Sequence, residues 1–194
     1  MPSPCPFSVA HPSPPVQSPV FVSDLSNPDA KLKMRQEMER ITEKEKQIFK
    51  ETFPIIFKEY RRNGLVLFAK YFSEFPHYKN IWPQFRTLQD SALLASNELA
   101  NHCSVYMNGL KEIVEVMDDE EKLTYFMARI ARSHVKWNIN KYHITNMLEG
   151  VDEVLKRSFK DGLSVDVTNA YHLLYDVIGN LLDIQKKLVI RRPF

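Results

Sequence analysis

The sequence is poor in cysteine, with only Cys5 and Cys103 among its 194 residues. Two cysteines cannot build the disulfide framework of a small secreted domain, so we expect a cytoplasmic protein. Long apolar runs are also missing, because no stretch approaches the roughly 18 apolar residues that span a bilayer. The N-terminal part lacks the basic start and apolar block of a secretory signal. We therefore expect no transmembrane segment and no signal peptide.

An excess of charge of one sign is lacking as well. The 26 Lys and Arg residues nearly balance the 24 Asp and Glu residues, which leaves a formal charge of +2. Such a balance gives no general reason to expect a nucleic-acid partner. Hydrophobic residues make up 44% of the chain and charged residues 26%, as in a globular protein, and the length suits one domain.

Proline and glycine divide the chain into a tail and a body. Eight of the 12 prolines lie in residues 1–28, mixed with serine and almost no charge, which predicts a disordered or extended tail. Between Gln84 and Arg192 there is no proline and there are only four glycines. A strand-rich domain needs a turn about every 8–12 residues, and these turn signals are too sparse for one. The body is therefore expected to be all-α, with about seven or eight helices.

Caps and periodicity place the expected helices. A charged helical lead-in covers 29–41, and Thr42 with Glu45 forms a capping box for the next helix. Pro54 should kink that helix or end it near Phe53. After Asn63-Gly64, further helices are expected over 65–75, 76–82, 91–117, 118–133, 142–159 and 165–188.

Two histidines, His102 and His134, lie on apolar stripes of different expected helices. For either residue alone, the simplest interpretation is a core histidine that is hydrogen-bonded to a backbone carbonyl. Together they suggest an apolar ligand that needs an imidazole on each side, and haem iron is one such ligand. The aromatic residues Phe68, Trp82 and Phe85 suit a flat macrocycle, although they could equally be ordinary core.

The order of residues resembles that of a globin, and most of all that of divergent invertebrate globins such as those of nematodes. The resemblance rests on Phe72, Phe75-Pro76, Trp82-Pro-Gln-Phe85, His102, Ile130-Ala-Arg-Ser-His134 and Ile139, and on the stretch Ala170 to Ile178. Its most specific part is the joint spacing from Pro76 to Trp82, to His102 and to His134. It runs from about Thr42 to Leu188 and implies a globin fold over 42–190 with heme b (iron protoporphyrin IX) as cofactor.

The resemblance also implies site residues. His134 is the expected proximal iron ligand, and His102 takes the distal position as the second ligand. Ser133 can accept a hydrogen bond from the other ring nitrogen of His134. The remaining expected haem contacts are Ile130 and Ile139 on the proximal side, Phe68 and Tyr106 on the distal side, and Trp82 and Phe85. Dioxygen, carbon monoxide or another small ligand and a redox protein are the expected partners.

Two positions depart from the globin pattern. Trp82 stands where phenylalanine is usual, and Tyr106 stands where a small aliphatic residue is usual. With Phe68 opposite them, the distal pocket is crowded, which favours closure of His102 on the iron. We expect a six-coordinate globin in electron transfer, redox signalling or oxygen sensing, with no enzymatic activity beyond one-electron chemistry at iron. A reversible dioxygen-binding globin and a haemless globin-shaped interaction module are the alternatives.

Two further expectations concern single residues. Cys103 follows the distal histidine and is expected to be a buried, inert thiol. The basic end of the chain, formed by Lys186, Lys187, Arg191 and Arg192, is expected to be a solvated helix terminus.

Overall fold

The computed structural model describes residues 27–135, 137–160 and 162–190. All regular elements within these ranges are helices, so the all-α prediction is confirmed. The tail expected over 1–28 lies outside the described residues except for its last two positions, and Pro28 already begins a helix.

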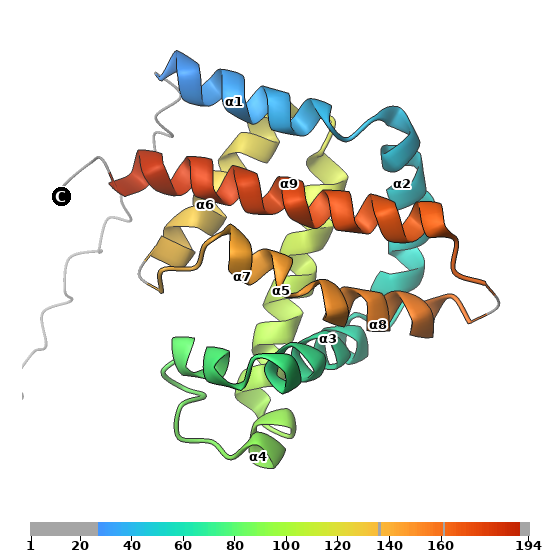
Figure 1. Ribbon diagram of the computed structural model, residues 1–194, viewed down its shortest axis with the longest axis vertical. Coiled ribbons are helices and arrows are strands. Elements are labelled where there is room, and N and C mark those ends of the chain that lie inside the picture. Colours follow the sequence, from blue (N-terminus) through green and yellow to red (C-terminus); the bar gives the residue numbers. More distant parts are fainter. Residues whose placement is uncertain (1–26, 136, 161, 191–194) are drawn as a thin grey trace, which may run out of the picture.

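Figure 1 shows the helices in chain order. They are α1 (Pro28–Glu39), α2 (Glu43–Lys58), α3 (Tyr60–Glu74), the 3₁₀-helix η1 (Pro76–Ile81), α4 (Asp90–Leu94), α5 (Asn97–Val116), α6 (Glu120–Val135), α7 (Lys141–Thr145), α8 (Leu148–Ser158) and α9 (Val165–Ile190).

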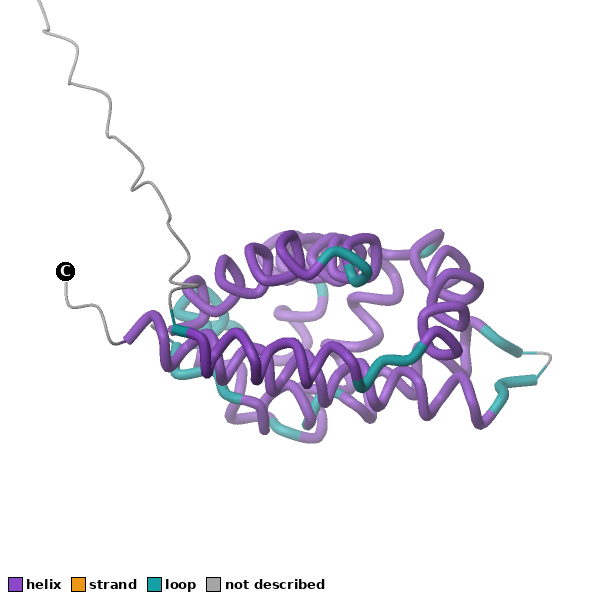
Figure 2. The backbone as a smooth tube through the Cα atoms, turned by 90° about the horizontal axis from the view of Figure 1, so that it is seen from above, coloured by secondary structure: helices purple, strands orange, loops and turns teal. Residues whose placement is uncertain are grey.

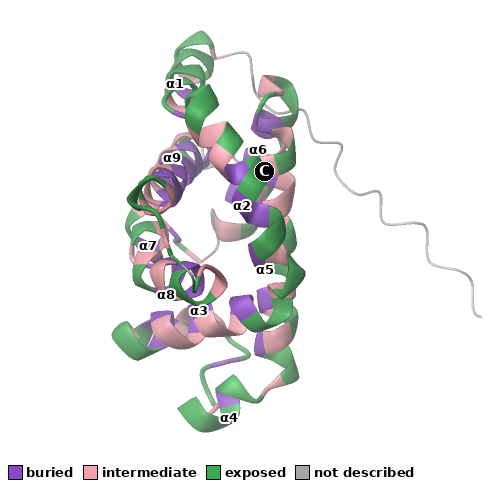
Figure 3. Ribbon diagram, turned by 90° about the vertical axis from the view of Figure 1, so that its right-hand side faces the viewer, coloured by how far each residue is buried: buried purple, intermediate pink, exposed green. Residues whose placement is uncertain are grey.

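The helices pack in two layers around one core. In Figure 3, α7, α8 and α9 lie on one side and α2, α5 and α6 on the other, and the buried residues face the space between them. The view from above in Figure 2 shows helices making up most of the described chain. The longest helix, α9, packs against α1, α2, α6, α7 and α8, so it contacts both layers.

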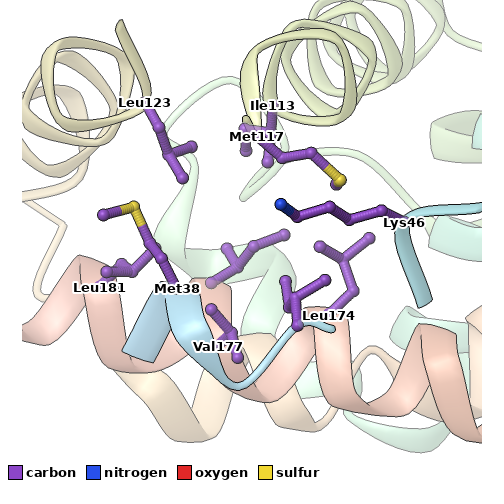
Figure 4. A pocket seen from close by; sticks show the side chains of 10 residues that line it. Met38, Lys46, Ile113, Met117, Leu123, Leu174, Val177 and Leu181 are labelled. Carbon is purple, nitrogen blue, oxygen red and sulfur yellow. The ribbon is translucent and has the colours of Figure 1, made fainter. Parts of the chain in front are cut away.

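The lead-in helix α1 belongs to the core. Met34 is only 2% exposed and lies against α9, and Arg35 forms an ion pair with Glu120 at the start of α6 at 3.0 Å. Met38 and Ile41 line an apolar pocket together with side chains of α2, α5, α6 and α9 (Figure 4). The helix therefore covers the core at the end where α6 and α9 meet.

The start of α2 is as predicted, whereas a helix end at Pro54, one of the two alternatives, does not occur. The Glu45 carboxylate accepts a hydrogen bond from the Thr42 backbone N–H at 2.9 Å, which confirms the capping box. The helix does not end near Phe53 but continues to Lys58 with Pro54 inside it. Phe53, directly before the proline, and Ile56, two residues after it, are buried, at 5% and 4% exposure. This packing offsets the backbone hydrogen bond that proline removes.

The break expected at Asn63-Gly64 also does not occur, because both residues lie inside α3. A Cβ atom on Gly64 would lie 2.8 Å from the Cβ of Cys103 on α5. Glycine is therefore present because two helices cross closely there. The end of α3 at Phe75, before Pro76, is as predicted.

Two expected helices are each divided in the structure. The helix expected over 91–117 is split into α4 and α5, because Ser96 caps α5 by accepting a hydrogen bond from the Leu99 N–H at 3.1 Å. The helix expected over 142–159 is split into α7 and α8. These two pieces pack on different partners: α7 crosses α9 at Gly179, and α8 crosses α3 at Gly150. One straight helix could not make both crossings.

Candidate functional site

The first candidate residue, His102, lies on α5 and is surrounded by aromatic rings. The centroid of its ring lies 5.0 Å from that of Phe68, 5.1 Å from that of Trp82 and 6.0 Å from that of Phe85. Within the described part of the chain, its imidazole makes these ring contacts but no hydrogen bond. Burial, and to a smaller extent the nearby His134, together lower the pKa of His102 to about 4, so the ring is uncharged at neutral pH.

The rings around His102 form a continuous aromatic wall. The Trp82 ring contacts Phe68 at 6.4 Å, Phe72 at 5.8 Å and Phe85 at 5.7 Å between centroids. Phe68 and Phe85 are 2% and 0% exposed. Three expected site residues, one from α3 and two from the segment after η1, therefore meet at the His102 side chain.

Tyr106 lies one turn after His102 and belongs to the same wall. Its ring meets Phe68 edge-on, with centroids 5.3 Å apart. Its hydroxyl is hydrogen-bonded to the hydroxyl of Tyr175 on α9. Burial raises the pKa of both phenols, so both stay protonated. Tyr175 was not among the expected site residues, and the sequence shows it only as another aromatic residue on an apolar stripe.

His134 lies on α6, where its ring is oriented by its own helix. Its Nδ1 atom lies 2.7 Å from the Ile130 carbonyl oxygen and 3.0 Å from Ser133 Oγ. A carbonyl oxygen can only accept, so this hydrogen bond requires the proton on Nδ1 and leaves a lone pair on Nε2 of the neutral ring. Burial lowers the pKa of His134, which favours this neutral form. Ser133 is placed beside Nδ1, but its hydroxyl also donates to the Ile130 carbonyl, at 2.7 Å.

The turn after α6 carries the next expected residue, Ile139, which is 4% exposed. The backbone N–H groups of Trp137 and Ile139 both donate to the His134 carbonyl, at 3.1 and 3.5 Å. The turn therefore folds back onto the end of the helix that holds His134. Ile130, one turn before His134, is half-buried against the core.

The expectation of a solvated basic end is wrong for Lys186. This residue is 6% exposed, and its ammonium donates hydrogen bonds to the Ile139 carbonyl and to Asn140 Oδ1, the latter at 2.6 Å. The signal in the sequence is its spacing, because Lys186 lies four residues after buried Leu182 and eight after buried Ile178. Lys187, the next residue, is exposed as expected.

Few side chains near His102 and His134 could act as ligands of a metal ion. The histidines of α5 and α6 are close enough for His134 to affect the pKa of His102. Over residues 27–135, 137–160 and 162–190, no cluster of three or more His, Cys, Asp or Glu side chains is suited to hold a metal ion.

None of the described helices is both long and apolar enough to cross a membrane. Cys103 is fully buried against α3, and burial raises the pKa of its thiol to about 12.

Comparison with known proteins gives consistent results. A family model described as Globin matches residues 65–182. Cytoglobin-1 of Danio rerio is 24% identical over 153 residues, covering 77% of this chain and 88% of the relative. Neuroglobin-1 of Oncorhynchus mykiss is 23% identical over 144 residues, covering 73% and 89%.

Solved structures match as well. A hexacoordinated heme protein from an anhydrobiotic tardigrade superposes with a TM-score of 0.67 at 14% identity, covering 75% of this chain and 95% of that one. Ferric Aplysia limacina myoglobin superposes with a TM-score of 0.65 at 18% identity, covering 73% and 95%. At these identities the likeness establishes the fold alone.

Proposed function

Because the chain belongs to the globin family, as the match over residues 65–182 establishes, we propose that it is a haem globin with six-coordinate, bis-histidyl iron. His134 is the proximal ligand and His102 the distal ligand. The cofactor is heme b, and the role is electron transfer, redox signalling or oxygen sensing. We also propose that the protein works in the cytoplasm, on the basis of its low cysteine content.

The orientation of His134 supports the proximal role. An iron-binding imidazole must be neutral and must offer one free nitrogen, while its other ring N–H is held by an acceptor. The Ile130 carbonyl is that acceptor, at 2.7 Å, and Ser133 Oγ lies beside it at 3.0 Å. Nε2 is then the nitrogen available to iron. The backbone of α6 thus fixes the tautomer of the ligand as well as its position.

The surroundings of His102 support the distal role, and this is the observation that carries the proposal. The His102 side chain is half-buried, and within the described residues its ring nitrogens form no hydrogen bond. The ring contacts that it makes there are with Phe68, Trp82 and Phe85. Its nitrogens are therefore left for a partner outside the chain. Iron is a partner that accepts the lone pair of an uncharged imidazole, and burial keeps this ring uncharged.

The aromatic wall favours the six-coordinate form. Phe68 and Tyr106 are in edge contact with centroids 5.3 Å apart, and Tyr106 is held there by its hydroxyl bond to Tyr175. Rings locked in this way restrict the room that an external diatomic ligand needs beside His102. The tardigrade protein that shares this fold is described as hexacoordinated.

Haem supplies an iron that exchanges one electron and can bind small ligands. The chain supplies the rest. Two fixed imidazoles allow a change of redox state with little rearrangement of the ligands. The buried rings of Phe68 and Phe85 limit the access of water to His102. With His102 on the iron, an incoming dioxygen or carbon monoxide molecule would have to displace it, which would make ligand binding slow and suited to a signal.

Absorption spectra of the purified full chain test the proposal. We expect a Soret band, and resolved visible bands in the reduced state without added ligand. His134→Ala should lose haem, whereas His102→Leu should keep it, change from low-spin to high-spin ferric iron and bind carbon monoxide faster. His77→Ala, which removes an exposed histidine, is the control and should leave the spectrum unchanged.

Each negative result has a clear meaning. A His134→Ala protein with full haem content and an unchanged spectrum would exclude His134 as the proximal ligand. A wild-type protein that is already high-spin, with a distal His102 that does not bind iron, would favour reversible dioxygen binding instead. A chain that takes up no haem would be the globin-shaped interaction module.

A further inference from the structure

Lys186 is a lysine in a place where lysine is rarely found. It is 6% exposed near the end of α9, and a buried ammonium is costly unless other groups compensate for its charge. Across residues 27–135, 137–160 and 162–190, no carboxylate forms an ion pair with its Nζ atom. Burial lowers the pKa of Lys186, and the negative charge of Asp183, about one turn earlier, only partly opposes this effect.

The two hydrogen bonds of Lys186 go to a single turn. Its ammonium donates to the Ile139 carbonyl and to Asn140 Oδ1, and both acceptors lie between α6 and α7. The same turn is tied to the proximal side, because the N–H groups of Trp137 and Ile139 donate to the His134 carbonyl. Lys186 therefore connects α9 to the end of the helix that carries His134.

The charge of Lys186 also reaches His134. Its ammonium donates to the Ile139 carbonyl, and the Ile139 N–H donates to the His134 carbonyl, so a single residue links the positive charge to the backbone of His134. A fixed positive charge behind an iron ligand opposes any additional positive charge on the metal. Because ferric iron carries one more positive charge than ferrous iron, this charge favours the ferrous state.

We propose that Lys186 is a positioning residue for the proximal ligand, which holds the turn after His134 in place and raises the reduction potential of the iron bound there. The inference rests on the proposed haem function. It adds a role that no sequence pattern assigned to this position. A neutral side chain at position 186 would leave the turn less firmly held and make the iron easier to oxidise.

Three variants of the full chain separate the charge from simple packing. Lys186→Met keeps a long, unbranched side chain but removes both the charge and the donor. Lys186→Arg keeps both. Lys187→Met removes a charge from the adjacent, exposed position and is the matched control. The measurements are the midpoint potential by spectroelectrochemistry and amide hydrogen exchange at residues 137–140.

We expect Lys186→Met to lower the equilibrium constant for reduction of the iron at least threefold. At 59 mV per tenfold change, this lowers the midpoint potential by about 28 mV. Amide exchange at residues 137–140 should become at least threefold faster. Lys186→Arg should have a midpoint potential and exchange rates close to those of the wild-type chain. Lys187→Met should change neither quantity. Circular dichroism confirms that each variant remains helical.

The proposal is overturned if Lys186→Met has the potential and the exchange rates of Lys187→Met. It is also overturned if Lys186→Arg shifts the potential as far as Lys186→Met, because the charge would then not be the cause. Failure of the haem proposal is distinguishable, since the wild-type chain would then show no Soret band. Hydrogen exchange at the turn needs no haem, so it would still decide whether Lys186 holds the turn.

Discussion

Tyr106→Phe should destabilise the protein more than the double replacement of Tyr106 and Tyr175 by phenylalanine. Tyr175 is 2% exposed, and the Tyr106 hydroxyl is its only hydrogen-bond partner within the described residues. Removing one hydroxyl leaves the other buried without a partner, which costs about 1–3 kcal/mol of the free energy of unfolding. For a chain of this length, about 2 kcal/mol lowers Tm by about 4–8 °C.

The double variant removes both hydroxyls and keeps both rings. No phenol is then left unpaired, so the loss should be close to zero, and the two sites should couple by about 1–3 kcal/mol. The free energies come from urea denaturation of the full chain at matched haem content. Tyr125→Phe is the control, because Tyr125 is 51% exposed and should change stability by less than about 0.5 kcal/mol. A double variant as unstable as the sum of the two single ones would refute the reasoning.

Two other predictions follow from close contacts. Tyr106→Val should open the aromatic wall and speed carbon monoxide association measured by flash photolysis, and Trp82→Phe should have a smaller effect. Unchanged association in Tyr106→Val would show that this ring does not limit access. Gly64→Ala should lose about 1–3 kcal/mol of the free energy of unfolding, since the new Cβ would lie 2.8 Å from the Cβ of Cys103. Gly109→Ala is its control, because nothing lies within 4 Å of a Cβ there. Its higher helix propensity should raise the free energy of unfolding by up to about 1 kcal/mol. Equal stability of these two variants would contradict the close crossing.

The parts of the fold that depend on local chemistry could be predicted from the sequence. The capping box at Thr42 and the helix end at Phe75-Pro76 each depend on neighbouring residues, and both are present. The apolar spacing along α9 is equally local, because side chains three and four residues apart share one face of a helix. The finer expectation that the protein is of the nematode globin type stays a prediction.

What the sequence could not show depends on contacts between distant segments. The sequence predicts a break at Asn63-Gly64, whereas the role of Gly64 depends on its close approach to Cys103 on another helix. Pro54 is held within α2 by packing that no local pattern reveals. Lys186 was assigned to solvent on its charge alone, although its acceptors at Ile139 and Asn140 lie more than 40 residues earlier in the chain.

The site residues were easier to predict individually than together. His102 and His134 stood out through their positions on apolar stripes, and the structure brings Phe68, Trp82 and Phe85 to His102. The Ile130 carbonyl was missed because a backbone acceptor leaves no trace in the choice of side chain. Tyr175 was missed because its partner hydroxyl becomes visible only when α5 and α9 are packed together.

The contact between α1 and α9 has a consequence for the order of folding. Met34 contacts Gln185, which lies 151 residues later in the chain, and α1 packs against α9. During synthesis, the apolar side of α1 leaves the ribosome long before its partner exists. This end of the core can therefore close only after α9 has emerged, and contacts of such long sequence separation form slowly because a large loop must be closed first. The newly made chain thus carries α1 without its packing partner until α9 has been synthesised.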